Sequence, residues 1–177
     1  MRANNSGSIL KSASIAKSTI QISNTEGESY QSLIAFTDEA SNEYDINYDA
    51  RLMSGANELT IYSLLNNESF AIQALSNFVE EKKVAIGFES LAGLNEIALL
   101  ETENFLEDCS VFLIDHLMNT THNLKESSYS FIVSDEITDE NRFELLYKLN
   151  TLHIQDANAA LDIKLVDNQI ELPENSS

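Results

Sequence analysis

Short runs of alternating polar and apolar residues recur along this chain. Side chains of a β-strand point to opposite faces of the sheet, so a period of two marks a strand with one buried face. Turn-forming residues separate the runs, as at 24–27 and 66–68, and many short strands at this spacing are typical of a sandwich or barrel. The alternating runs lie at residues 19–23, 84–88, 129–133, 143–147 and 161–165.

These runs predict an all-β fold. We expect an antiparallel two-sheet β-sandwich, jelly-roll-like, over residues 12–149, after a flexible lead-in at 1–11. Segments 70–79 and 97–106 also have apolar spacing or propensity that suits a helix, so periodicity leaves both readings open there. The side chains expected to point inward are Ile20, Ile22, Leu33, Ile61, Ile86, Phe88, Leu113, Phe131, Phe143 and Leu145.

The last segment, residues 150–177, differs from the rest. Residues 156–160 are typical of a linker or turn, and 161–172 offer one hairpin across Asp167 and Asn168. An isolated hairpin is marginally stable in water, so its apolar face needs another surface.

The charge of the chain limits its partners. Ten Lys and Arg face 29 Asp and Glu, which gives a net charge of −19. Nucleic-acid binding needs a basic footprint, and an anionic membrane surface repels an acidic chain. No stretch reaches the roughly 18 apolar residues of a membrane span, and the first eight residues lack the apolar core of a signal peptide.

Acidic residues between 38 and 49 form the candidate metal site. Calcium is held by six to eight oxygen ligands, which loops of a β-sandwich can supply. Asp45 and Asp49 are the residues we expect to bind it, with Asp38, Glu39 and Glu43 nearby. The alternative is a solvated loop whose aspartates cap turns.

Nothing in the sequence predicts catalysis. Cys109 precedes an apolar run, where a buried, inert thiol is the usual state. Glu101 with Glu103, or Asp135 with Glu136, could be an acid and a base only if one carboxyl lay in a cleft with a raised pKa. We therefore expect a protein that is not an enzyme and needs no cofactor beyond the candidate calcium ion.

Aromatic and basic residues offer weaker signals. Tyr44, Tyr48 and Tyr62 could form a platform on which a sugar stacks, or could lie at the rim of the core. Arg51 and Arg142 are notable because basic residues are scarce, and each is expected to pair with a carboxylate.

Several phrases, taken in order over residues 15–149, resemble a known module. It is the β-sandwich module just upstream of the sorting signal in large type IX secretion substrates of Flavobacteria and relatives. The phrases are ISNTEG at 22–27, NEYDINYDA at 42–50, LTIYSL at 59–64, VAIGF at 84–88, HNLK at 122–125, YSF at 129–131 and NRFELLY at 141–147.

The tail carries a second resemblance. LDIKLVDNQIEL at 161–172 resembles the first hairpin of the C-terminal sorting domain of those substrates, whose later part is absent here. The resemblance implies that this is an internal piece of a longer parent chain, and that segments 70–79 and 97–106 are strand and loop.

The implied function is a non-catalytic structural or interaction module of a secreted or cell-surface protein, next to its sorting signal. Its expected partners are the rest of the parent chain and, through the missing part of the sorting domain, the type IX machinery. The alternative is a module that binds carbohydrate or another surface polymer.

Overall fold

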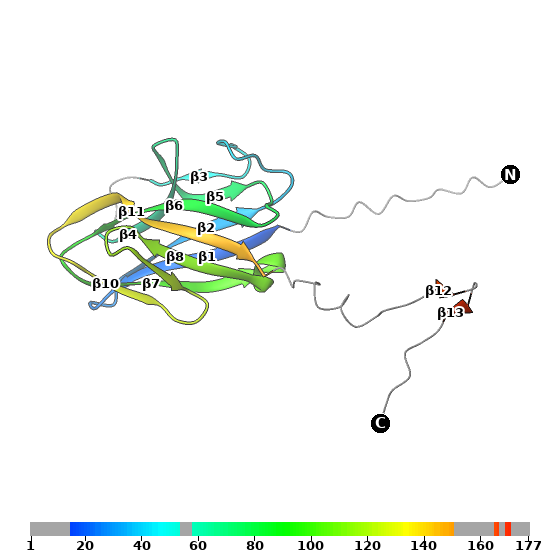
Figure 1. The fold of residues 1–177 in the computed structure, drawn as a ribbon. Coiled ribbons are helices and arrows are strands. Elements are labelled where there is room, and N and C mark those ends of the chain that lie inside the picture. Colours follow the sequence, from blue (N-terminus) through cyan, green and yellow to red (C-terminus); the bar gives the residue numbers. More distant parts are fainter. Residues whose placement is uncertain (1–14, 54–57, 151–164, 167–168, 171–177) are drawn as a thin grey trace, which may run out of the picture.

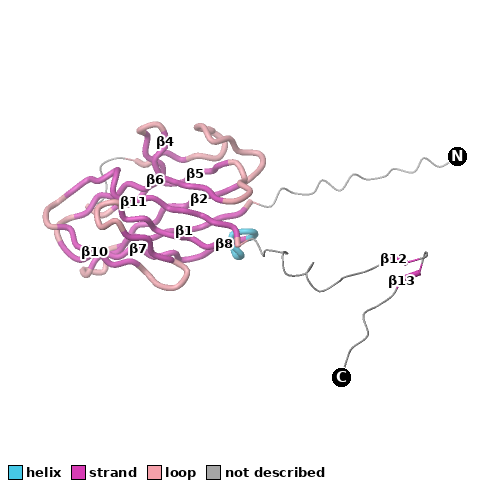
Figure 2. Tube along the Cα trace, in the orientation of Figure 1, coloured by secondary structure: helices cyan, strands magenta, loops and turns pink. Residues whose placement is uncertain are grey.

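The computed structural model describes residues 15–53, 58–150, 165–166 and 169–170 (Figure 1). The all-β prediction is confirmed: strands dominate the described residues, and the helical segment among them is a single 3-10 turn, η1 (Asn104–Asp108) (Figure 2). No helix in this part of the chain is long and apolar enough to cross a membrane.

Four of the five predicted runs lie within strands, and the fifth, at 161–165, lies outside the described residues except for Leu165. The strands are β1 (Ala16–Asn24), β2 (Ser29–Phe36), β3 (Ala50–Arg51), β4 (Thr60–Leu65), β5 (Glu68–Leu75), β6 (Glu81–Ser90), β7 (Gly93–Glu103), β8 (Cys109–Asp115), β9 (Thr120–Asn123), β10 (Tyr129–Val133), β11 (Ile137–Leu149), β12 (Leu165–Val166) and β13 (Gln169–Ile170). Segments 70–79 and 97–106, which periodicity left open, contribute β5 and β7, and η1 follows β7 directly.

One sheet wraps into a barrel that is nearly closed. Its strand order is β10-β7-β1-β2-β5-β4-β6-β11-β8-β9, with β3 added beside β5. The two end strands, β9 and β10, are consecutive in the chain, and the rings of His122 and Tyr129 lie 5.5 Å apart between them. The sheet therefore leaves a gap that side chains bridge.

The sheet is mixed, which the sequence did not predict. β2 and β5 pair in parallel, from Leu33 opposite Ile72 to Phe36 opposite Leu75, and the other pairings are antiparallel. A parallel pair needs a long connection between its strands, and β3 and β4 lie in that connection. No local pattern marks such a pairing, because its two strands are far apart in the chain.

Turn chemistry explains the tight β4–β5 connection. Asn66 and Asn67 both adopt left-handed backbone conformations, with φ angles of 52° and 64°. Two such residues make the turn that suits the twist of a two-residue hairpin, and asparagine tolerates this conformation better than most residues. The turn predicted at residues 66–68 is confirmed.

The core fills the barrel. All the residues predicted to point inward belong to this core except Leu33. Leu33 lies instead with a smaller cluster outside the barrel, around Ala35, Ala40 and Ala74. The run from Leu33 to Phe36 is apolar at every position, so its alternation could not show which face is inward.

The acidic segment 37–49 covers that outer cluster. It starts where the Thr37 N–H donates to the Leu75 carbonyl, and it returns where Asp49 accepts a hydrogen bond from the Ala74 N–H. Tyr48 packs against the cluster from this segment. Both faces of β2 and β5 are therefore buried at this point, which accounts for the continuous apolar run.

The C-terminal hairpin is described in part. Leu165 pairs with Ile170 and Val166 with Gln169, in antiparallel register across residues 167–168. The remainder of the predicted hairpin, the lead-in at 1–11 and the linker at 156–160 lie outside the described residues.

Candidate functional site

Four turns gather at one end of the barrel, which we call the free end. They join β1 to β2, β6 to β7, β8 to β9 and β10 to β11. The backbone pairing of Val133 with Gly93 holds two of these turns side by side. The described barrel starts at Ile15 and ends at Asn150, both at the opposite end (Figure 1).

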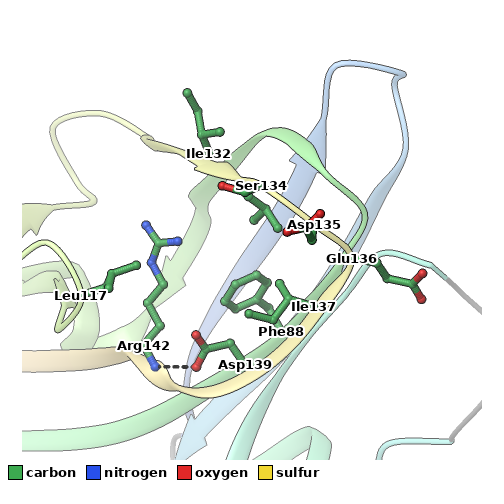
Figure 3. Close-up of a pocket in the computed structure, with 10 residues that line it drawn as sticks. Phe88, Leu117, Ile132, Ser134, Asp135, Glu136, Ile137, Asp139 and Arg142 are labelled. Atoms are coloured by element: carbon green, nitrogen blue, oxygen red, sulfur yellow. Dashed lines mark hydrogen bonds between the residues drawn. The ribbon is translucent and has the colours of Figure 1, made fainter.

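A pocket of about 250 Å³ opens at the free end, between the β8–β9 turn and the β10–β11 turn. Figure 3 shows Phe88 beside Ile137 within it, and Asp135 and Glu136 along the β10–β11 turn. Its lining is formed by Phe88, Leu117, Ile132, Val133, Ser134, Asp135, Glu136, Ile137, Asp139 and Arg142.

A buried ion pair lies beneath this pocket. Arg142 Nη2 donates to Asp115 Oδ2 at 2.8 Å, and Arg142 Nε lies 3.3 and 3.2 Å from Asp115 Oδ1 and Oδ2. Asp115 is 1% exposed and Arg142 is 8% exposed. The guanidinium carbon is 4.7 Å from the centre of the Phe131 ring and 4.9 Å from that of Phe143, so aromatic faces enclose the cation.

Asp115 is also the anchor of the β8–β9 turn. Its Oδ1 accepts hydrogen bonds from the Leu117 and Met118 N–H groups, both at 3.0 Å, and its Oδ2 accepts one from the Tyr129 hydroxyl at 3.0 Å. Burial by itself raises the pKa of Asp115. The hydrogen bonds from Arg142, Met118 and Tyr129, with the charge of Arg142, outweigh burial and hold this pKa below its ordinary value.

Arg142 is positioned by a local irregularity in β11. The register of β11 against β6 shifts between Asp139 and Phe143. Asp139 Oδ1 accepts a hydrogen bond from the Arg142 N–H at 3.0 Å (Figure 3). It accepts another from the Asn141 N–H at 2.9 Å. Such irregularities bend a strand and redirect its side chains. Here Arg142 reaches Asp115 while Phe143 enters the core.

These contacts commit the Asp115 carboxylate to holding the fold around the pocket. A general acid or base works best with a pKa near the working pH, whereas the pKa of Asp115 is lowered and both its oxygens accept hydrogen bonds. The carboxylate is therefore ionised at neutral pH and fixes the shape of the pocket. Asp135 and Glu136, which the sequence offered as a candidate acid and base, are exposed residues of the pocket lining.

Asp45 and Asp49, the predicted calcium ligands, shape a turn in the acidic segment. Asp49 Oδ2 accepts a hydrogen bond from the Asp45 N–H at 2.7 Å, and Asp49 Oδ1 accepts one from the Ala74 N–H at 2.8 Å. Asp45 Oδ1 accepts hydrogen bonds from the N–H and side-chain amide of Asn47. Among the described residues, no three His, Cys, Asp or Glu side chains gather in a group that could hold a metal. Calcium binding at this pair stays a prediction.

The neighbouring acidic residues also have protein partners. Glu39 accepts a hydrogen bond from the Tyr48 hydroxyl, Glu43 accepts one from Asn66, and Asp38 accepts one from Asn77. The carboxylates of this segment are thus spread along it, each engaged with a different donor.

Cys109 and the other carboxylate pair are engaged in the fold. Cys109 is buried in the core, and burial raises the pKa of its thiol to about 11 although Lys125 lowers it. The thiol is therefore protonated at neutral pH. Glu101 accepts a hydrogen bond from Thr19, and Glu103 pairs with Lys17 at 3.6 Å.

The three tyrosines considered as a sugar platform have separate roles. Tyr48 packs against the outer cluster, and its hydroxyl donates a hydrogen bond to Glu39. Tyr62 is buried, so it cannot stack on a sugar. Tyr44 is partly exposed and lies under the Arg51 guanidinium, whose carbon is 3.8 Å from the ring centre. Arg51 in turn pairs with Glu68 at 2.8 Å on the surface.

A groove on the outer face of the barrel is a second hollow with polar lining. Its volume is about 480 Å³, and it lies where β2 and β5 separate before their parallel pairing begins. Ser32 bridges the separation by donating to the Ala71 carbonyl. The groove is lined by Thr19, Gln31, Ser32, Leu33, Ala71, Ile72, Leu100 and Glu101.

Sequence reasoning found part of this site. It predicted that Arg142 pairs with a carboxylate, which is confirmed, but it named neither the partner nor the burial of the pair. The signal that could have identified Asp115 is the alternation of β8. Cys109, Val111, Leu113 and Asp115 are buried in turn, so a carboxylate occupies an inward position of an otherwise apolar stripe. A buried carboxylate requires a partner.

We predict that Asp115→Asn costs about 3–5 kcal/mol of unfolding free energy at pH 7, because it leaves Arg142 charged and buried without its partner. The folded-state pKa of Asp115 is lowered, so its contribution to stability is present above the unfolded pKa and lost as pH falls through the folded pKa. Urea unfolding from pH 7 to pH 3 should therefore show the gap between wild type and variant shrinking below about pH 4.

The matched control for this variant is Glu144→Gln, which breaks the solvent-accessible Lys83–Glu144 pair between β6 and β11. We expect it to change stability little, because solvent screens the pair. A small effect of Asp115→Asn at pH 7, equal to that of Glu144→Gln, would contradict the buried pair.

The calcium prediction needs a differential test. Calcium bound to the folded state alone at a hundredfold excess over Kd adds about 2.7 kcal/mol, and extracellular modules often bind calcium with Kd values of roughly 0.1–1 mM. Thermal melts in calcium chloride and in sodium chloride at equal ionic strength should then differ, and Asp45→Asn and Asp49→Asn should each remove the difference. Equal shifts in the two salts would leave only general screening of the acidic surface.

Comparison with known proteins identifies the family. A family model described as a domain of unknown function (DUF8693) matches residues 2–147, which include the barrel from β1 through most of β11. Searches of curated proteins and of solved structures found no match. The chain therefore belongs to the DUF8693 family of domains of unknown function.

Proposed function

We propose that this chain is a non-catalytic interaction module of a secreted or cell-surface protein, and that it binds its partner through the free end. The observation that carries the proposal is the exposure of large apolar side chains around the pocket, with Ile132 71% and Leu117 70% exposed. Apolar patches of this kind on a folded domain commonly mark sites of interaction.

The rigidity of the free end supports this role. The buried Asp115–Arg142 pair holds the β8–β9 turn by the hydrogen bonds to Leu117 and Met118, so the exposed side chains project from a fixed support. A preorganised surface loses less entropy on binding than a mobile loop does.

For the fold we propose a jelly-roll-like sandwich as the finer description. One layer would contain β10, β7, β1 and β2, and the other would contain β4, β6, β11, β8 and β9, which follow one another in the sheet order. The short parallel pairing of β2 with β5 would then join the two layers at one edge. Core side chains from both halves support this reading, among them Ile20 and Phe143.

For the location we propose export through a type IX pathway to the outside of the cell. The resemblance of residues 15–149 to the module that precedes the sorting signal supports it, as does the resemblance of 161–172 to the start of a sorting domain. The net charge of −19 suits a protein that remains dispersed outside the cell. The rest of the parent chain and the type IX machinery would then be its partners.

Carbohydrate binding is the second candidate, and the groove favours it. Thr19, Gln31 and Glu101 line it with hydroxyl, amide and carboxylate groups, which are the kinds of group that bind sugar hydroxyls. Leu100 and Ile72 add apolar surface. The groove lies on a side of the barrel, so this function would use a different surface from the free end.

Site-specific crosslinking separates the two candidates. A photoreactive amino acid placed at Ile132, at the free end, should crosslink to a protein on the cells that export the full-length parent. The same amino acid at Leu100, in the groove, serves as the matched control and should give no such product. Both positions are exposed leucine or isoleucine residues, so intrinsic reactivity does not bias the comparison.

A glycan array tests the second candidate on the same protein. Specific binding that is lost in Glu101→Gln, with no crosslink at position 132, would replace the interaction proposal by carbohydrate binding. A crosslink at 132 together with an array that shows no specific binding supports the interaction module.

A further inference from the structure

Charge is distributed unevenly between the two ends of the barrel. The described lysines, at 17, 82, 83, 125 and 148, lie toward the end where the described barrel starts and finishes. Lys125, for example, donates to the carbonyls of Leu106 and Glu107 in η1, and η1 contacts the start of β1. None of the described lysines lies in the four turns of the free end.

The free end combines acidic and apolar side chains. Asp135 and Glu136 are exposed on the β10–β11 turn beside the pocket, and Glu26 is exposed on the β1–β2 turn. The cation in the pocket lining, Arg142, is already neutralised by Asp115. The exposed charged side chains that line the pocket are therefore acidic, although an arginine lies beneath it.

The exposed apolar residues form one patch. Ile132 lies opposite Leu94 in the β10–β7 pair and shares the pocket lining with Leu117, whose neighbour Met118 is 63% exposed. Exposed hydrophobic side chains grouped on a chain whose net charge is −19 indicate a surface that is covered in use.

We propose that the free end binds a basic, apolar segment of a partner protein: an aliphatic side chain enters the pocket, and flanking lysine or arginine side chains pair with Asp135 and Glu136. The inference rests on the proposed interaction function and adds the chemistry of the partner. The pocket volume of about 250 Å³ suits one or two aliphatic side chains, and the acidic rim selects cations beside them.

Other occupants fit these features less well. A second copy of the chain carries the same net charge of −19, so the two copies repel each other. A nucleic acid or an anionic membrane is repelled in the same way. A segment that is both basic and apolar can cover the exposed apolar side chains and pair with Asp135 and Glu136 at the edge of the pocket.

Binding of defined peptides tests the proposal. The probes are three twelve-residue synthetic peptides: one alternating leucine with lysine, one alternating leucine with glutamate, and one alternating serine with lysine. Titrations followed by fluorescence anisotropy, with the full chain, should show binding of the leucine–lysine peptide. The other two peptides should bind at least tenfold more weakly.

Matched variants locate the binding. Ile132→Ser, at the free end, should weaken the leucine–lysine peptide at least tenfold, while Leu100→Ser, in the groove, should leave it unchanged. Asp135→Asn combined with Glu136→Gln should weaken it several-fold and reduce its salt dependence. The same charge change at the opposite end, Glu80→Gln with Glu81→Gln, should have little effect.

Two results overturn the proposal: no preference for the leucine–lysine peptide, or equal weakening by the two acidic pairs, which would show attraction to net charge alone. Thermal melts of each variant confirm that it is folded. The proposed function fails separately, since it depends on the crosslink at position 132. A crosslink without the peptide preference would keep the interaction module and reject this partner chemistry.

Discussion

The buried ion pair between Asp115 and Arg142 is the interaction on which the free end depends. It joins the last inward position of β8 to an irregular segment of β11, and it is enclosed by aromatic rings. Because Asp115 also accepts hydrogen bonds from the N–H groups of Leu117 and Met118, the conformation of the β8–β9 turn depends on the same carboxylate. Two buried charges are costly unless each is satisfied, and here the hydrogen bonds that satisfy them also build the wall of a pocket.

The pair explains how one end of an acidic barrel can hold an apolar pocket in a fixed shape. A hydrophobic core alone would leave the turns to be held by their own backbone hydrogen bonds. The core supplies Phe88 and Phe143, which pack tilted against each other at 5.4 Å between ring centres, and the ion pair sits on this aromatic layer. Core packing, the buried ion pair and the geometry of the β8–β9 turn therefore depend on one another at the free end. The acidic segment 37–49 covers a different part of the barrel, and hydrogen bonds to Asp49 hold it there.

Alternation predicted β1, β6, β10 and β11 and nine residues of the core, because burial of one face of a strand leaves an alternating pattern in the sequence. The prediction placed Leu33 on the wrong face because both faces of β2 are covered there, so its residues do not alternate between polar and apolar. No sequence pattern within β2 or β5 indicates that these two strands pair in parallel. The candidate site was predicted only through Arg142: its partner Asp115 is 27 positions away, and pairing across that distance depends on the register of β8 and β11.

Amide hydrogen exchange at Leu117 and Met118 tests most directly whether the ion pair fixes the free end. Both residues have exposed side chains, but their N–H groups bond to a buried carboxylate, so we expect slow exchange at neutral pH in the wild-type protein. In Arg142→Met these two amides should lose at least tenfold more protection than the amide of Ile20 in β1, which has a paired strand on each side. Wild-type protection of both turn amides in a folded Arg142→Met protein would contradict the account.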